Sequence, residues 1–234
     1  SNQLKPFMAN HLDLEEQEQL DQLKHFWNQY GNLITWILIA VLGSIAAWNG
    51  YHMWQRNQAT QSAAMYDEVE KVVRSGDVQK AERAFTDMKD RSAKMTYTEQ
   101  AGLLVAKMAY EAGKSDVAKS SLSWLVENAS DKGYASVARL RLATLLVDAK
   151  SYDDAVKLLG TGVSEEFSAL ADDRRGDIYV LQEKKSEAKA EYLKAFNGFD
   201  EQSEYRRLVL VKLNALGVDP TSDSKAIVSA EAAK

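Results

Sequence analysis

The chain has 234 residues, no cysteine, two prolines and a formal net charge of -5. Its length allows one or two domains. The lack of cysteine excludes disulfides and thiol nucleophiles, and the mild acidity argues against nucleic-acid binding, which needs clustered Lys and Arg. Charged residues make up 27% of the chain, yet none occurs from His25 to Gln55. The sequence therefore joins two segments of different character, one apolar and one rich in charge.

The N-terminal arm, residues 1–32, carries five acidic and two basic side chains. Residues 1–7 precede Met8, a plausible initiator, and are set aside as either a non-native remnant or an upstream extension. Asp13 is then expected to cap a short amphipathic helix. Its apolar face is formed by Leu20, Leu23, Trp27 and Tyr30. This helix is either a docking element for a membrane partner or a solvated lead-in whose aromatic rings lie at the interface.

Residues 33–54 are predicted to form a transmembrane helix, because about 22 residues rising 1.5 Å each span a hydrocarbon core of about 30 Å. Trp and Tyr stand near both ends, as in interfacial belts. A buried helix of a soluble protein seldom runs this far without a charge, and a signal peptide has a shorter apolar region followed by small residues. We therefore expect an uncleaved anchor. Gly43 and Ala47 form a small-xxx-small pair suited to helix contact. The few flanking Lys and Arg residues do not decide its orientation.

Beyond Arg56 the sequence contains an internal repeat. Segments that end in equivalent alanines align with spacings of 37, 37 and 33 residues, at Ala81, Ala118, Ala155 and Ala188. A large residue follows each alanine by four positions, and the position twelve before it is small in three of the four segments. This pattern predicts helix pairs, because a small residue on the first helix lets the second helix approach. Stacked pairs then bury a continuous core.

The predicted fold is all-α. A single N-terminal transmembrane helix is followed, over residues 57–219, by a tetratricopeptide-like α-solenoid of about four helix pairs. Residues 204–216 are expected to form a C-terminal capping helix that Gly217 and Pro220 terminate. The period is similar to that of the tetratricopeptide repeat, although the consensus tryptophan and the final proline are not matched. Residues 220–234 are small and polar and are predicted to be a disordered tail.

No catalytic or metal-binding set emerges from the sequence. The three histidines precede the repeats and form no metal-ligand pair, and the loop at Gly160 lacks the Lys of a phosphate-binding loop. An Arg-Gly-Asp tripeptide surrounds Gly176, which holds a packing position of the repeat. Opposite charges three and four residues apart are interpreted as a solvated ladder at Asp172, Asp173, Arg174, Arg175 and Asp177. We therefore predict no enzyme, no cofactor, no metal and no small-molecule substrate.

The resemblance to tetratricopeptide arrays implies that the first helices line a binding groove. The implied groove residues are Tyr66, Leu103, Lys107, Tyr110, Leu140, Val147, Asp173 and Leu181. This largely apolar set suits an apolar segment or a partner helix. The carboxylate clamp of some superfamily members is not matched, since Lys107, Thr144 and Asp177 occupy its asparagine position. Alternatively, several groove residues belong to the core between repeats.

The order of elements resembles the YfgM-type proteins of Gram-negative bacteria. The resemblance covers an acidic arm (DLEEQEQLDQLKHFW), one anchor, an aromatic exit (WNGYHMW) and the degenerate four-unit array. It implies a single-pass inner-membrane protein with a cytoplasmic N-terminus and a periplasmic repeat domain. The implied partners are the SecYEG translocon, the membrane-anchored periplasmic chaperone PpiD and, through the arm, the response regulator RcsB.

Two functions follow from this resemblance. In the first, the chain is a non-enzymatic ancillary subunit of the translocon that helps hand emerging secretory proteins to periplasmic chaperones. In the second, it is an inner-membrane scaffold or regulator that sequesters a cytoplasmic stress-response regulator through its N-terminal arm.

Overall fold

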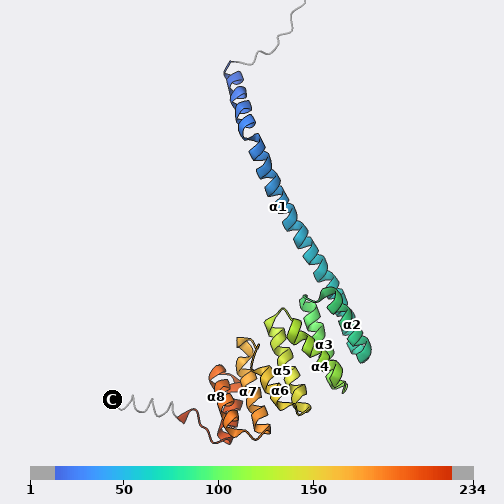
Figure 1. Ribbon diagram of the computed structural model, residues 1–234, viewed down its shortest axis with the longest axis vertical. Coiled ribbons are helices and arrows are strands. Elements are labelled where there is room, and N and C mark those ends of the chain that lie inside the picture. The colour runs from blue at the N-terminus through green and yellow to red at the C-terminus, as the bar shows by residue number, and fades with distance from the viewer. Residues whose placement is uncertain (1–13, 223–234) are drawn as a thin grey trace, which may run out of the picture. The chain divides into compact units, whose positions relative to one another are not determined.

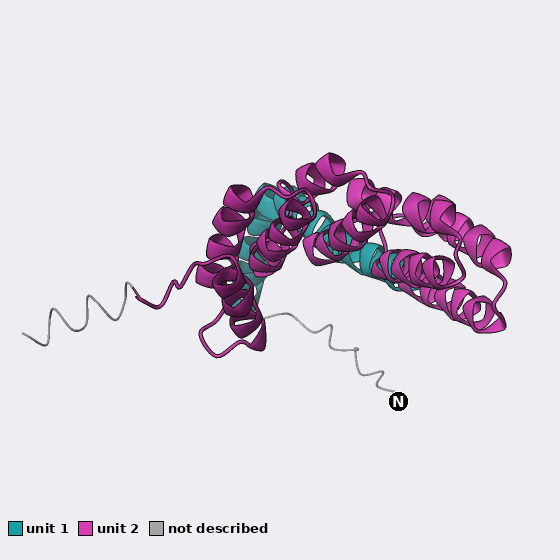
Figure 2. Cartoon of the chain, turned by 90° about the horizontal axis from the view of Figure 1, so that it is seen from below, with its two compact units in different colours: residues 1–57 teal, residues 58–234 magenta. Residues whose placement is uncertain are grey.

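The computed structural model describes residues 14–222, whose regular structure consists of helices α1 to α9 (Figure 1). The all-helical prediction is therefore confirmed. The chain divides into two compact units, residues 1–57 and 58–234, which are coloured separately in Figure 2. The first helix, α1 (Leu14–Ser75), contributes to both units. The predicted cap at Asp13 and most of the predicted tail, residues 223–234, lie outside the described residues.

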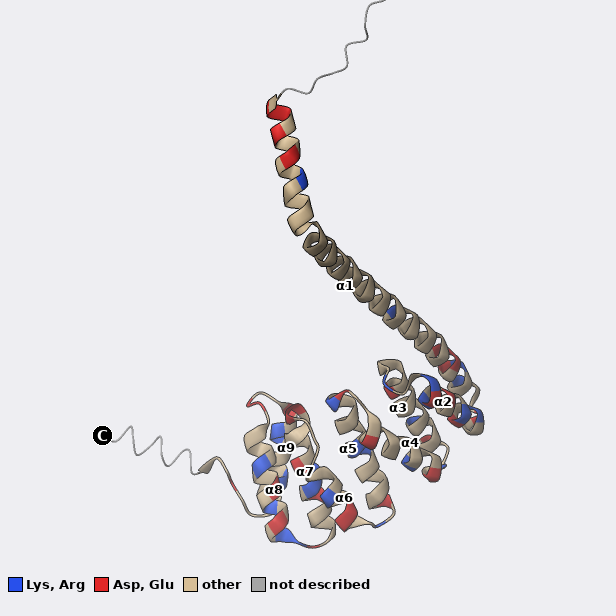
Figure 3. Ribbon diagram, turned by 45° about the horizontal axis from the view of Figure 1, so that its top comes forward, with Lys and Arg blue, Asp and Glu red and all other residues tan. Residues whose placement is uncertain are grey.

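The described part of unit 1, residues 14–57, is the N-terminal part of α1. Acidic Glu15 and Glu16 lie in its first turn, where they complement the positive end of the helix dipole. Figure 3 shows these charges giving way to a long stretch without charge. Over its most apolar stretch the helix has a mean hydropathy of 1.7, and only 6% of that stretch is buried within the protein. Among the described residues, this one helix is long and apolar enough to cross a membrane, and it fits a single-pass anchor.

Unit 2 is a stack of helix pairs. The last turns of α1 precede α2 (Val78–Ser92) and form the first pair with it. The remaining helices are α3 (Thr96–Glu111), α4 (Ser115–Asn128), α5 (Lys132–Asp148), α6 (Tyr152–Leu159), α7 (Glu165–Leu181), α8 (Lys185–Gly198) and α9 (Glu204–Ala215). Helices that are consecutive in sequence pack against each other from α2 to α9, which is the arrangement of a helical solenoid.

The repeated positions form the core of this stack, as the sequence pattern predicts. All four equivalent alanines are completely buried. The large residues that follow them are at most 3% exposed; they are Phe85, Leu122, Leu159 and Tyr192. At Gly176 a Cβ atom would lie 2.5 Å from the ring of Tyr192. The first helix of that pair therefore needs a residue without a side chain where the second helix approaches.

The turn inside each pair places one residue in the left-handed region of backbone conformation. The φ angles are 80° at Gly76, 72° at Gly113, 59° at Lys150 and 61° at Glu183. After three of these residues, the next amide donates a 2.8 Å hydrogen bond to a carbonyl of the preceding helix, in the pairs Lys114–Ala109, Ser151–Leu146 and Lys184–Tyr179. These bonds close the helix C-terminus as a Schellman motif.

The helix α9 covers the C-terminal end of the last pair, as predicted for a capping helix. Val209 and Leu213 are buried against the cluster that contains Tyr192 and Phe196 of α8. Gly217 ends the helix with φ 79°, and Val218 donates to the carbonyl of Leu213 over 2.9 Å. This turn has the same geometry as the turns that follow the first helix of each pair. α9 therefore corresponds to the first helix of a further pair.

Candidate binding groove

The first helices of successive pairs lie next to each other in unit 2. α3 contacts α5, and α5 contacts α7. The second helices of the pairs, α2, α4, α6 and α8, make fewer contacts with one another. Figure 2 shows unit 2 as a curved array. In a curved stack the elements that approach most closely lie on the inner side, so the first helices line the concave face.

Exposed apolar side chains of unit 2 are concentrated on these first helices. Between residues 58 and 222, the large hydrophobic side chains that are exposed, by 38 to 66%, are Tyr97, Tyr110, Val180, Leu181, Tyr205, Leu208 and Val211. They belong to α3, α7 and α9, and none of them lies on α2, α4, α6 or α8. This uneven distribution makes the first helices the candidate interaction surface of unit 2.

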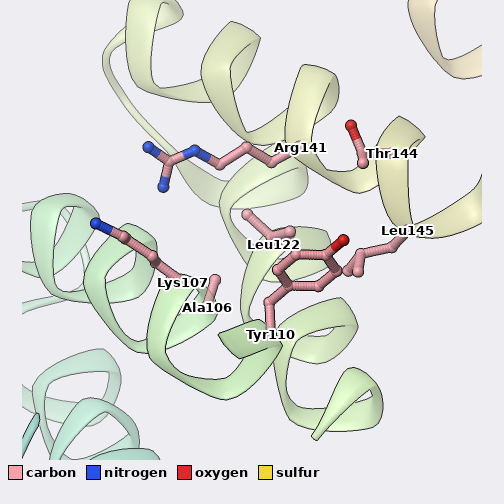
Figure 4. Close-up of a pocket in the computed structure, with 7 residues that line it drawn as sticks. All are labelled: Ala106, Lys107, Tyr110, Leu122, Arg141, Thr144 and Leu145. Carbon is pink, nitrogen blue, oxygen red and sulfur yellow. The ribbon is translucent and has the colours of Figure 1, made fainter. Parts of the chain in front are cut away.

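A cavity of about 280 Å³ opens between α3 and α5 (Figure 4). Its lining residues are Ala106, Lys107, Tyr110, Leu122, Arg141, Thr144 and Leu145. The hydroxyl of Tyr110 donates to Asp148 Oδ2 over 3.1 Å, which holds the ring in place, and this hydrogen bond is the main reason why the pKa of Tyr110 is raised. We call this cavity the α3–α5 pocket.

A second cavity, of about 140 Å³, occupies the equivalent place between α5 and α7. It is lined by Leu140, Ala143, Thr144, Val147, Leu159, Arg174, Asp177, Ile178 and Leu181. Its lining includes one cationic and one anionic side chain, Arg174 and Asp177, whose Nη1 and Oδ2 atoms lie 3.9 Å apart. We call this cavity the α5–α7 pocket. The repeat thus creates two related pockets with different charge.

The predicted groove residues are distributed over several environments. Two of them, Lys107 and Tyr110, line the α3–α5 pocket. Leu140, Val147 and Leu181 line the α5–α7 pocket. Their role in binding stays a prediction.

The other three predicted groove residues lie outside both pockets. Leu103 packs against the buried cluster of α3, α4 and α5. Tyr66 packs on the first cluster, with its ring 5.7 Å from that of Tyr97. Asp173 is buried and accepts a 2.7 Å hydrogen bond from Lys212 Nζ, so it joins α7 to α9. For these residues the structure favours the alternative reading, in which groove positions contribute to inter-repeat packing.

Sequence reasoning missed Arg141, which lies in the α3–α5 pocket. The signal that could have found it is its register, because Arg141 follows the groove position Leu140 just as Arg174 follows Asp173. Successive residues on a helix are about 100° apart, so a position that flanks a groove residue still borders the groove.

The charged segment of α7 forms a partly buried network. Arg175 Nη2 lies 2.8 Å from Asp172 Oδ1 and also donates to Glu191 of α8. The side chains of Arg175 and Glu191 are only 16% and 11% exposed, and burial raises the pKa of Asp172. The interpretation as a solvated ladder therefore holds for Arg174 but not for Arg175, which joins two helices. Within residues 14–222 no three His, Asp or Glu side chains are grouped as a metal site.

The predicted sites of unit 1 lie on one continuous helix. Leu20, Leu23, Trp27 and Tyr30 are all exposed on α1. At Gly43 a Cβ atom would meet nothing within 4 Å, so the surface around this glycine and Ala47 is open. Docking through the arm and helix contact through the anchor both stay predictions.

These features define a tetratricopeptide-like solenoid that exposes an apolar groove. A family model described as a tetratricopeptide repeat-like domain matches residues 24–218. The chain is 31% identical to the ancillary SecYEG translocon subunit of Neisseria gonorrhoeae, over 89% of the chain and 100% of the relative. It is 26% identical to the subunit of that name from Haemophilus influenzae, over 87% of the chain and 98% of the relative. The subunit of that name from Escherichia coli is 25% identical, over 75% of the chain and 84% of the relative. The chain belongs to this family of ancillary SecYEG translocon subunits, and the resemblance inferred from the sequence is confirmed.

Proposed function

We propose that this chain is a non-enzymatic ancillary subunit of the Sec translocon that binds a periplasmic chaperone of the PpiD type and helps hand over emerging secretory proteins. The observation that carries the proposal is the concentration of exposed apolar side chains on α3, α7 and α9. Unfolded secretory proteins and partner helices both present apolar side chains, which such a surface would remove from water. The names of the relatives support the association with the translocon.

The proposal includes a location and an orientation. α1 anchors the chain in the bacterial inner membrane by a single pass, with the N-terminus in the cytoplasm and the repeat domain in the periplasm. The length and hydropathy of α1 support the anchor, and the resemblance to YfgM-type proteins supports the orientation. Gly43 and Ala47 offer a surface on which a helix of the translocon could pack closely.

In-cell photocrosslinking tests this function. A photoreactive amino acid at Tyr110 or Leu181 of the groove should capture the chaperone or secretory chains, and one at Gly43 should capture translocon subunits. The same amino acid at Lys119, an exposed residue of the second helix α4, is the matched control and should give few adducts. Equal capture from Tyr110 and Lys119 would contradict the groove. The absence of translocon and chaperone adducts from all positions would contradict the function itself.

An alternative function places the action in the arm. In this proposal the chain is a scaffold or regulator that sequesters a cytoplasmic stress-response regulator of the RcsB type. The five exposed large apolar side chains from Leu20 to Tyr30, which are the four predicted docking residues and Phe26, favour it, since they lie on a helix with acidic residues. Deletion of residues 14–30 separates the two functions. Persistent translocon association with altered stress signalling supports the alternative, whereas unchanged signalling contradicts it.

A further inference from the structure

We propose that the α3–α5 pocket binds an acidic side chain of a bound protein segment together with a large apolar side chain of the same segment. This inference rests on the proposed function, because it names the chemistry of the segment that the groove takes. It follows from the two ends of the pocket, which differ in character, and from the contrast with the α5–α7 pocket.

One end of the pocket is apolar. Leu122, Leu145 and Ala106 are buried side chains that form its floor. The ring of Tyr110 forms a wall and is fixed by its hydrogen bond to Asp148. In Figure 4, Tyr110, Leu122 and Leu145 gather at this end. A Leu or Phe side chain of a partner would lose its contact with water here.

The other end is cationic. Lys107 and Arg141 extend side by side, from α3 and α5 respectively (Figure 4). Arg141 Nη1 donates to the carbonyl of Leu103 over a long 3.4 Å, and no carboxylate of residues 14–222 lies within 4.0 Å of this guanidinium. Lys107 Nζ lies 3.9 Å from Glu111 Oε1, but these side chains are 63% and 64% exposed and their attraction is weak. A carboxylate that enters this end would therefore gain charge-assisted hydrogen bonds from Arg141.

The α5–α7 pocket lacks this preference. Its equivalent arginine, Arg174, faces Asp177, which occupies the register position of Thr144. An entering carboxylate would meet a carboxylate already present. The selectivity for acidic segments therefore belongs to the α3–α5 pocket, and Arg174 provides a matched control.

The acidic group is placed within a segment, not at a chain terminus. Exposed apolar side chains continue beyond the pocket at Val180 and Leu181 on α7 and at Leu208 and Val211 on α9. A bound segment that covers them must run past the pocket. We therefore assign the carboxylate to Asp or Glu, and not to a free C-terminus.

Peptide binding to the full chain in lipid nanodiscs tests the assignment. The probe is a fluorescein-labelled peptide, acetylated and amidated at its ends, with the central sequence Leu-Phe-Glu-Ala-Leu. It should bind about tenfold more tightly than its Glu-to-Gln counterpart, since a charge-assisted pair is then lost. Replacing its Phe by Ala should also weaken binding. The Arg141→Gln variant should bind the Glu and Gln peptides alike, whereas Arg174→Gln should keep the preference.

Several outcomes overturn the inference. They are equal affinity for the Glu and Gln peptides, equal effects of Arg141→Gln and Arg174→Gln, no peptide binding at all, or tighter binding of a Gln peptide with a free C-terminal carboxylate. Unchanged hydrogen exchange of α5 in Arg141→Gln serves as the folding control. If crosslinks to the Sec machinery form while peptides bind without a charge preference, only this inference fails. If those crosslinks are absent, the proposed function fails.

Discussion

The two ends of unit 2 use the same helix pairs but fill them differently. Around α2 to α4, the three largest fully buried side chains, Phe85, Met88 and Leu125, are apolar, and the ring of Phe85 meets that of Trp124 edge-on at 5.6 Å. The charged side chain buried there, Glu99, accepts backbone hydrogen bonds from Ser130 and Asp131 and forms no ion pair within the described residues. Around α7 to α9, paired charges are buried as well, including Asp173 and Glu191. One backbone arrangement is therefore compatible with two kinds of core.

The difference has physical consequences. Apolar packing loses stability in proportion to the volume removed and depends little on pH. A buried ion pair contributes only while both partners are present, because a single buried charge is costly. The same type of substitution is therefore expected to act differently at the two ends.

The largest effect is expected in the apolar end. Phe85→Ala removes a buried ring that packs on α3 and α4, and it should lower the free energy of unfolding by about 3–5 kcal/mol. Amide hydrogen exchange of the full chain in nanodiscs, measured at increasing urea concentration, would show this loss of unfolding free energy in α2 to α4. Tyr97→Ala, at a partly exposed ring, is the control and should cost much less. A loss below about 1 kcal/mol for Phe85→Ala would contradict an apolar core at this end.

In the charged end, removing one charge of the network of Asp172, Arg175 and Glu191 should cost more than removing all three. Glu191→Ala leaves Arg175 half-paired in a site with little solvent, and we expect a loss of about 2–3 kcal/mol around α7 and α8, below the value for a fully buried pair because both side chains keep some exposure. The triple variant Asp172→Leu, Arg175→Leu and Glu191→Leu leaves none of these charges without its partner and should recover most of that loss. Equal losses in the single and triple variants would show that the charges act independently.

The same contrast explains what the sequence could predict. The spacing of the alanines, the large residues and the turns depends on contacts within one unit, so it is visible in the chain. The pairing of Arg175 with Glu191 does not recur in the preceding unit, where the equivalent residues are Leu142 and Leu158, and the pairing of Asp173 with Lys212 joins α7 to α9. Spacing along α7 does not show which of its charges face another helix. For that reason the solvated-ladder interpretation failed at Arg175 and the groove prediction included the buried Asp173.

A pH dependence should distinguish the charged end further. The hydroxyl of Tyr192 donates to Asp177 Oδ1 over 2.7 Å, and burial together with this hydrogen bond raises its pKa well above the usual value. In the unfolded chain the phenol loses its proton near pH 10, as tyrosines ordinarily do, while the folded chain keeps it. The unfolded state then binds fewer protons, so stability falls as pH rises, by up to about 1.4 kcal/mol per pH unit.

Comparison of the wild type with Tyr192→Phe measures this contribution. The difference in unfolding free energy around α7 to α9 should change between about pH 9 and pH 11 and stay constant near neutrality. Phe lacks the ionisable group, so the variant should lose less stability over that range. Parallel pH profiles of the two proteins would contradict the raised pKa.

The smallest effect should not depend on how the core is filled and concerns the turns. Lys150 and Glu183 adopt φ near 60°, whereas the equivalent turns at Gly76 and Gly113 use glycine. A side chain in this conformation costs about 1 kcal/mol relative to glycine. Lys150→Gly and Glu183→Gly should therefore each stabilise their helix pair by about 0.5–1 kcal/mol. The reverse change, Gly113→Ala, tests strain alone, since a Cβ atom there would meet nothing within 4 Å. It should destabilise α3 and α4 by a similar amount. Because the turn geometry does not depend on how the core is filled, unequal effects of Lys150→Gly and Glu183→Gly would show that the charged end also constrains its turns.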